Sequence, residues 1–167
     1  MKKILSTAAA LALTCAMSIG QTLAADHPKV NIAFPTAATT GALYPLGAGI
    51  ANLWNTRLPY VTARAQASNG GIQNLNLLKA GDAQVSFAVS SITYEALHGQ
   101  RGFKGRAYEG VRVLAGLYYN PNQVVARGDS GVKSLADFKG KSFAPGAAGG
   151  TTEVESRIHF TAAGLKY

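Results

Sequence analysis

The chain has 167 residues, of which 47% are hydrophobic and 14% charged, with 16 Lys and Arg against 8 Asp and Glu and a net charge of +8. This apolar content excludes wholesale disorder, and the length is sufficient for one domain, or one and a fraction, with a buried core. A single Cys excludes a disulfide framework and a Cys-rich metal site.

The first 25 residues have the pattern of a secretory signal peptide. A basic start at residues 1–3 precedes an apolar run over 4–19 and small residues up to Ala25. A membrane anchor is the less favoured alternative, because the run is short and no stop-transfer flank follows. Cleavage removes two lysines and the only Cys. No later stretch approaches the ~18 apolar residues of a membrane span, so we expect an exported, periplasmic protein.

Strands and helices are predicted to alternate after the leader. Three short apolar segments, 30–34, 61–65 and 85–89, have the character of strands. Helical periodicity follows each of them, carried by Leu46, Ile50, Leu53 and Trp54, then by Ile72, Leu75 and Leu78, and then by Tyr94 and Leu97. Pro45 suits a first helical turn, and Gly81 a helix end. Repeated β-α units predict an α/β fold with a parallel-rich sheet and helices on both faces.

The remaining residues are expected to form two strands at 111–118 and 123–127 and a brief strand at 142–144. Capping boxes, in which a polar residue and an acid three positions later close a helix start, are predicted from two residue pairs. These pairs are Ser134 with Asp137 and Thr152 with Glu155, and the last helix carries an apolar stripe of Val154, Ile158, Ala162 and Leu165. No strand follows this helix, so we expect its stripe to have little partner sheet.

Four polar loops, 39–41, 68–71, 90–91 and 149–152, lead into predicted helix starts. In a parallel sheet such loops lie at the carboxyl ends of the strands, where open α/β folds bind ligands. Their N–H groups and the positive end of each helix dipole suit a carboxylate or phosphate. The same small polar residues are also needed as plain helix caps, so both interpretations stay open.

The sequence offers little for catalysis. The Gly-rich stretch 146–152 has no Lys before its Thr pair, so it does not match a phosphate-binding P-loop, and no Gly-x-Ser-x-Gly motif is present. The three histidines are expected at the surface, and Glu153 and Glu155 point to different faces of one helix. We therefore expect no enzyme, metal or cofactor. Nucleic acid binding is not expected either, because the basic clusters lack interleaved aromatic residues.

Five segments together resemble a known family. They are TTGALYPLG at 39–47, ASNGGIQNL at 67–75, LAGLY at 114–118, SLADFKGK at 134–141 and GGTTE at 149–153. In this order and spacing the chain resembles, from Val30 to Leu165, the TAXI-type solute receptors of TRAP transporters, which are two-lobed periplasmic binding proteins of type II. The segment at 134–141 is shared with binding proteins of other transporters, whereas the first two segments indicate the TAXI branch.

The resemblance implies a first ligand-binding lobe over 26–117, a crossover strand and hinge over 118–130, and the start of a second lobe over 131–167. Two lobes need roughly 250–300 residues at typical domain sizes, so we expect the second lobe to be incomplete. The implied function is capture of a small organic anion or amino acid for the membrane permease subunits of a TRAP transporter. A periplasmic sensor or adaptor that binds a partner protein, an ABC-type solute-binding protein and an exported enzyme are the alternatives.

The candidate ligand-binding residues come from the four loops and two tyrosines. Hydroxyls and helix-end N–H groups would hold a carboxylate, and either tyrosine could cover the apolar part of the solute. The set is Thr40, Gly41, Tyr44, Ser68, Asn69, Ser90, Tyr118, Gly150, Thr151 and Thr152.

We predict that protein recovered from the periplasm begins near Asp26, because the basic start, the apolar run and the small-residue site are all present. Intact-mass spectrometry of exported material tests this, and a mass that starts at Met1 would contradict it.

Overall fold

The computed structural model describes residues 27–166, so the predicted leader at 1–25 lies outside the described residues. In chain order the elements are β1 (Val30–Pro35), α2 (Leu43–Arg57), β2 (Val61–Gln66), α3 (Gly71–Ala80), α4 (Ser90–His98), the 3₁₀ turns η1 (Arg101–Phe103) and η2 (Leu135–Phe138), and α5 (Thr151–Ala162). Within residues 27–166, no helix is both long and apolar enough to cross a membrane.

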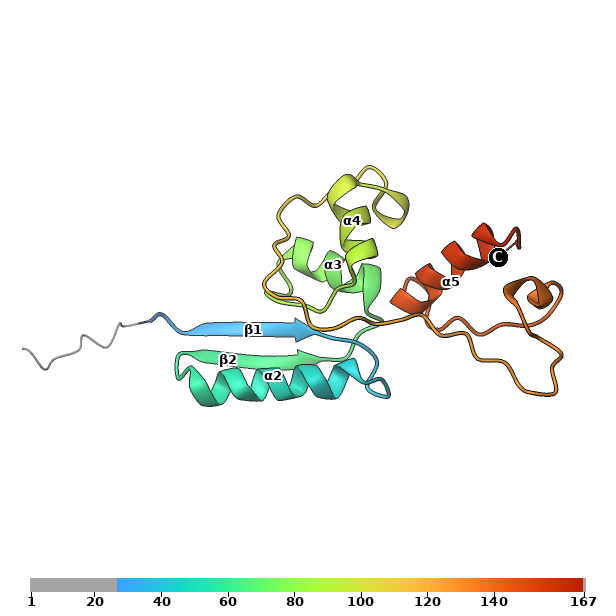
Figure 1. Cartoon of the computed structure of the whole chain (residues 1–167). Helices are drawn as coiled ribbons and strands as arrows, with labels where there is room; N and C mark the ends of the chain where they lie inside the picture. The colour runs from blue at the N-terminus through green and yellow to red at the C-terminus, as the bar shows by residue number, and fades with distance from the viewer. Residues whose placement is uncertain (1–26, 167) are drawn as a thin grey trace, which may run out of the picture.

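Strands β1 and β2 pair in parallel, with Val30 opposite Val61 at the start of the register. Helix α2 makes the crossover between them, and the ring of its Trp54 stacks on Phe34 of β1, with 5.4 Å between the ring centroids. Figure 1 shows α2 running along β2, with α3 and α4 on the opposite side of the two strands. The predicted α/β class is therefore confirmed, with a parallel sheet and helices around it.

The buried face of α2 is rotated from the predicted stripe, of which only Ile50 and Trp54 are partly buried. Leu46 and Leu53, expected on the buried stripe, are exposed, Leu53 by 52%. The buried residues are Gly47 and Ala51. A Cβ on Gly47 would overlap the methyl group of Thr36, which follows β1. Close approach of the helix to the sheet therefore favours small residues at this contact over large apolar ones.

The segment predicted as a strand at 85–89 lies beside β1 but is not a regular strand. The N–H of Gln84 donates to the carbonyl of Ala33 at 3.3 Å, and that of Phe87 donates to the carbonyl of Pro35 at 3.4 Å. A full ladder is interrupted because Pro35 has no N–H to donate. The N–H of Ala33 is in turn taken by Oε1 of the Gln84 side chain at 2.9 Å.

The later strand predictions are wrong for the described chain, because 111–118, 123–127 and 142–144 contain no strand. Side chains along 111–127 are largely exposed, Val113 by 79% and Tyr119 fully. Apolar and β-branched residues favour a strand only where a neighbouring strand satisfies their backbone groups and covers their side chains. The expected crossover segment at 118–130 is likewise neither helix nor strand.

Glycine ends the helices where the sequence predicts it. Gly81 and Gly99 adopt the left-handed conformation, with φ of 83° and 60°, directly after α3 and α4. After α5, Gly164 has φ of 75°. The N–H of Leu165 reaches back to the carbonyl of Phe160 at 3.0 Å, which is the bond of a Schellman motif.

One of the two predicted capping boxes is present. Asp137 accepts hydrogen bonds from the backbone N–H of Lys133 at 3.0 Å and of Ser134 at 2.7 Å, at the start of η2. These bonds hold the pKa of Asp137 below its usual value. Because the folded-state pKa is lowered, their contribution to stability is present at neutral pH and is lost as the pH falls through that lowered pKa.

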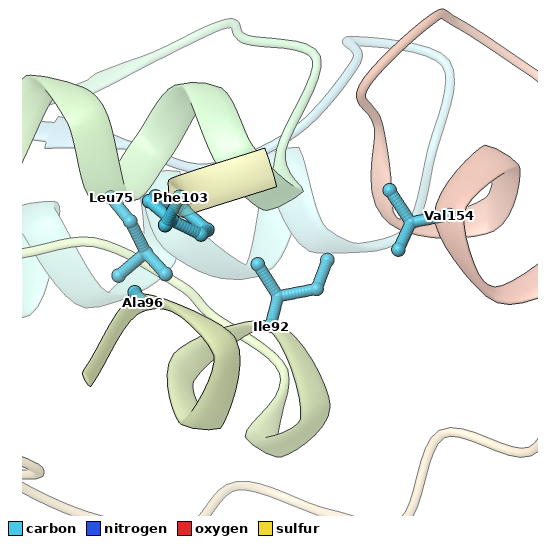
Figure 2. Packing of buried hydrophobic residues seen from close by; sticks show 5 residues of the cluster. All are labelled: Leu75, Ile92, Ala96, Phe103 and Val154. Atoms are coloured by element: carbon cyan, nitrogen blue, oxygen red, sulfur yellow. The ribbon is translucent and has the colours of Figure 1, made fainter. Parts of the chain in front are cut away.

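The hydrophobic core draws on segments far apart in the sequence. Leu75 of α3, Ile92 and Ala96 of α4, Phe103 of η1 and Val154 of α5 form one buried cluster (Figure 2). Partly buried Ile158 packs against it. Val154 and Ile158 of the α5 stripe thus pack against the helices α3 and α4 and not against a sheet, whereas Ala162 is exposed.

A single buried amide joins the core to the sheet. The Nδ2 group of Asn74, which is 0% exposed, lies 3.3 Å from the carbonyl of Pro35, 3.0 Å from that of Thr36 and 2.9 Å from that of Phe87. Its two N–H donors are shared among these three acceptors. Asn74 therefore fixes α3 against both the end of β1 and the segment beside it.

We predict that Asn74→Ala lowers the free energy of unfolding by about 3 kcal/mol or more, because it leaves buried carbonyls without a donor. Urea denaturation measures this. Asn76→Ala, two residues further along the same helix, is the matched control and is expected to cost under about 1 kcal/mol. Equal costs for the two variants would contradict a special role of the Asn74 amide.

Candidate functional site

The loops that follow β1 and β2 are joined by hydrogen bonds at the carboxyl ends of the strands. The N–H and the hydroxyl of buried Thr36 both donate to the carbonyl of Gln66, each at 3.0 Å. The N–H of Ser68 donates to the carbonyl of Ala37 at 3.1 Å. The first two predicted ligand loops therefore lie side by side, as the parallel sheet implies.

The polar side chains of the second loop shape the loop itself. The hydroxyl oxygen of buried Ser68 accepts a hydrogen bond from the N–H of Gly70 at 3.1 Å. The N–H of Asn69 donates to Oε1 of Gln73 at 2.9 Å, in the first turn of α3. Ser68 thus acts as a turn residue in this structure, and its own O–H is still available to donate to another group.

The starts of α3 and α5 meet backbone to backbone. The N–H of Ile72 donates to the carbonyl of Gly149 at 3.3 Å. A Cβ on Gly71 would lie 2.8 Å from that oxygen and 2.9 Å from the N–H nitrogen of Thr151, and a Cβ on Gly150 would lie 2.8 Å from the carbonyl of Asn69. Only glycine permits this approach. The structure therefore brings together the loops of Ser68, Asn69, Gly150 and Thr151.

The other predicted residues lie outside this contact. Thr40 and Gly41 form an exposed turn, and Tyr44 is half-buried in the first turn of α2. Ser90 is the exposed first residue of α4 and does not cap it, since Val89 occupies the capping position. Tyr118 is largely exposed, and Thr152 lies exposed in the first turn of α5.

The predicted capping box of Thr152 with Glu155 is wrong, because α5 begins after Gly150. The carboxylate three positions into the helix is Glu153, which is buried, accepts from the N–H of Gly149 at 3.2 Å and pairs with Arg157. The spacing of Gly150 and Glu153 was the available signal, but glycine is a less obvious cap than threonine.

Glu155 instead connects α5 to α4. Its Oε1 accepts a hydrogen bond from the hydroxyl of Ser91, and its Oε2 lies 3.5 Å from Nδ2 of Asn122. The same Nδ2 lies 3.1 Å from Nε2 of His159, one turn further along α5. Sequence reasoning did not identify this polar cluster, because its members come from three separate segments and no local spacing relates them.

An open pocket of about 440 Å³ lies beside the contact between Ile72 and Gly149, where α3 meets the loop before α5. Its lining comes from α3, from Asp82 just after this helix and from the loop before α5, and comprises Ile72, Gln73, Asn76, Leu77, Ala80, Asp82, Ala148 and Gly149. Among the residues that the structure describes, no three His, Cys, Asp or Glu side chains gather as metal ligands would.

The meeting of two helix starts favours binding of an anion. Each helix start carries N–H groups without intrahelical acceptors and the positive end of a helix dipole. In α3 the N–H of Ile72 donates to the carbonyl of Gly149, and the N–H groups of Gln73 and Asn74 both lie within reach of the carbonyl of Gly70. Thr151 and Thr152 supply the first N–H groups of α5 and two hydroxyls beside them.

We predict that Gly71→Ala separates the start of α5 from α3, because the added Cβ would overlap Gly149 and Thr151. Gly81→Ala is the matched control. Both glycines have positive φ, 48° and 83°, and both changes incur about 1–2 kcal/mol of backbone strain, but a Cβ on Gly81 meets nothing within 4 Å. Amide exchange over 151–162 should accelerate only in Gly71→Ala. Equal exchange in the two variants would show that this contact does not hold α5.

A family model matches most of the chain. Residues 34–167 match the model of the NMT1-like family, which is of the periplasmic solute-binding type and indicates a substrate-binding protein of a transporter. The match covers all ten candidate residues and most of the chain. The chain therefore belongs to the NMT1-like family.

Proposed function

We propose that this protein is the periplasmic solute-binding subunit of a TRAP transporter of the TAXI type, and that it captures a small carboxylate such as an amino acid or a dicarboxylate. The observation that carries the proposal is the convergence of the starts of α3 and α5 at Gly71 and Gly149. The five sequence segments that resemble TAXI receptors support the choice of transporter class.

The chemistry of the convergent helix starts favours a carboxylate. Backbone N–H groups and helix dipoles hold anions without a charged side chain. The hydroxyls of Thr151 and Thr152 stand at the same helix start and can donate to a second oxygen. An excess of basic residues over acidic ones raises the capture rate for anions by long-range attraction.

Under this proposal the protein is a receptor and performs no covalent chemistry. Reversible hydrogen bonds to N–H and hydroxyl groups are sufficient to hold a carboxylate, and delivery to the permease requires that the solute leave unchanged. The alternative of a sensor or adaptor would use a protein partner in place of the small solute.

A thermal-shift series with amino acids and dicarboxylates tests the proposal. Binding to the folded state raises the melting temperature in proportion to ligand concentration and affinity. We predict that Thr151→Val weakens binding of the responding solute about tenfold, because one hydrogen bond to a charged group contributes about 1.5–3 kcal/mol. Calorimetry gives the affinities.

Thr62→Val is the matched control, since Thr62 is exposed on β2, and it should leave the affinity unchanged. Unchanged affinity in Thr151→Val as well would show that the hydroxyl serves only the helix start. If no carboxylate or amino acid raises the melting temperature, the proposal of solute capture is wrong, and binding of a protein partner becomes the favoured alternative.

A further inference from the structure

Strand β2 has one edge that is not paired with β1. Residues of a parallel strand direct their N–H and C=O groups alternately to the two edges. The carbonyls of Tyr60 and Gln66 accept from β1 and its continuation, at 2.8 Å from the N–H of Val30 and 3.0 Å from that of Thr36. The odd-numbered residues Val61, Ala63 and Ala65 therefore direct their backbone groups to the outer edge.

The side chain of Asn55 occupies the centre of this outer edge. Its Oδ1 accepts from the N–H of Ala63 at 2.6 Å, and its Nδ2 donates to the carbonyl of the same residue at 2.9 Å. These are the two bonds that a residue on a neighbouring antiparallel strand would exchange with Ala63. Beside it, the N–H of Val61 is taken by the carbonyl of Leu58 at 2.9 Å.

We propose that Asn55 closes the outer edge of β2 against pairing with β2 of a second copy of this chain. An open strand edge is a template for strand addition, and native proteins block such edges. Asn55 sits on the last turn of α2 and imitates one residue of an added strand. A second strand cannot form its central bonds until this amide leaves Ala63.

The outer edge of β2 can pair with the same edge of a second copy, and we therefore take a second copy as the partner that Asn55 excludes. An antiparallel pair centred on Ala63 sets Ala63 against its own counterpart and Val61 against Ala65. On the other face of the strand, Thr62 of one copy then lies opposite Arg64 of the other, so no like charges oppose each other directly. Ala63 and Ala65 add no bulk at this edge.

Asn55→Ala tests the proposal, with Asn52→Ala as the matched control on the exposed side of the same helix. Sedimentation equilibrium over a range of protein concentrations should show self-association of Asn55→Ala at least about tenfold stronger than that of Asn52→Ala. The double variant Asn55→Ala with Ala63→Pro removes the central N–H and should return to a monomer. Association that persists in the double variant, or that is absent from Asn55→Ala, would overturn the proposal.

A second measurement does not depend on the folding of these variants. In the unmodified protein, amide exchange at Ala63 should be slow, because its N–H is held by Asn55. Exchange at Ala63 as fast as that of a free amide would show that the edge is open and would also overturn the proposal. Neither experiment involves a solute, so their outcome is separate from that of the proposed function.

Discussion

The position of α3 against the sheet depends on the buried amide of Asn74. Without this amide the carbonyls of Thr36 and Phe87 would lose their donor, at a cost of about 1–3 kcal/mol each. The amide donates to them from within a helix, so it holds α3 against the end of β1 and the segment at Phe87. The loop of Ser68 and Asn69, which leads into α3, takes its place beside the end of β1 for this reason.

The second constraint is the absence of side chains where α3 and α5 begin. Gly71 and Gly150 let two backbones come closer than any Cβ would allow. This contact directs α5 so that Val154 reaches the cluster of Leu75 and Ile92. The candidate site therefore arises from close backbone approach together with a shared hydrophobic core, and the hydroxyls are secondary to it.

Sequence reasoning succeeds where the determinants are local and fails where they are not. The bounds of α3 and α4 follow from apolar periodicity and from the glycines that end them, and the parallel pair follows from the β-α alternation. The strand predicted at 85–89 does not form, and its own residues could not indicate this, because the interruption of the ladder comes from Pro35 at the end of β1. Asn74 resembles a surface amide in sequence, and only the tertiary fold brings three carbonyls to it.

The polar residues near the helix starts divide into two groups by burial, and the division separates folding from binding. Thr36, Ser68 and Asn74 are buried, and their side chains are hydrogen-bonded to backbone groups, those of Thr36 and Asn74 in neighbouring segments and that of Ser68 in its own loop. Because these side chains hold the backbone of the loops, their replacement alters loop geometry before it alters any contact with a solute. Thr40, Ser90 and Thr152 are exposed, and of these only Thr152 lies at the start of α5. Under the proposed function, the hydroxyls of Thr151 and Thr152 would contact a solute, whereas the buried residues hold the loops that position this helix start.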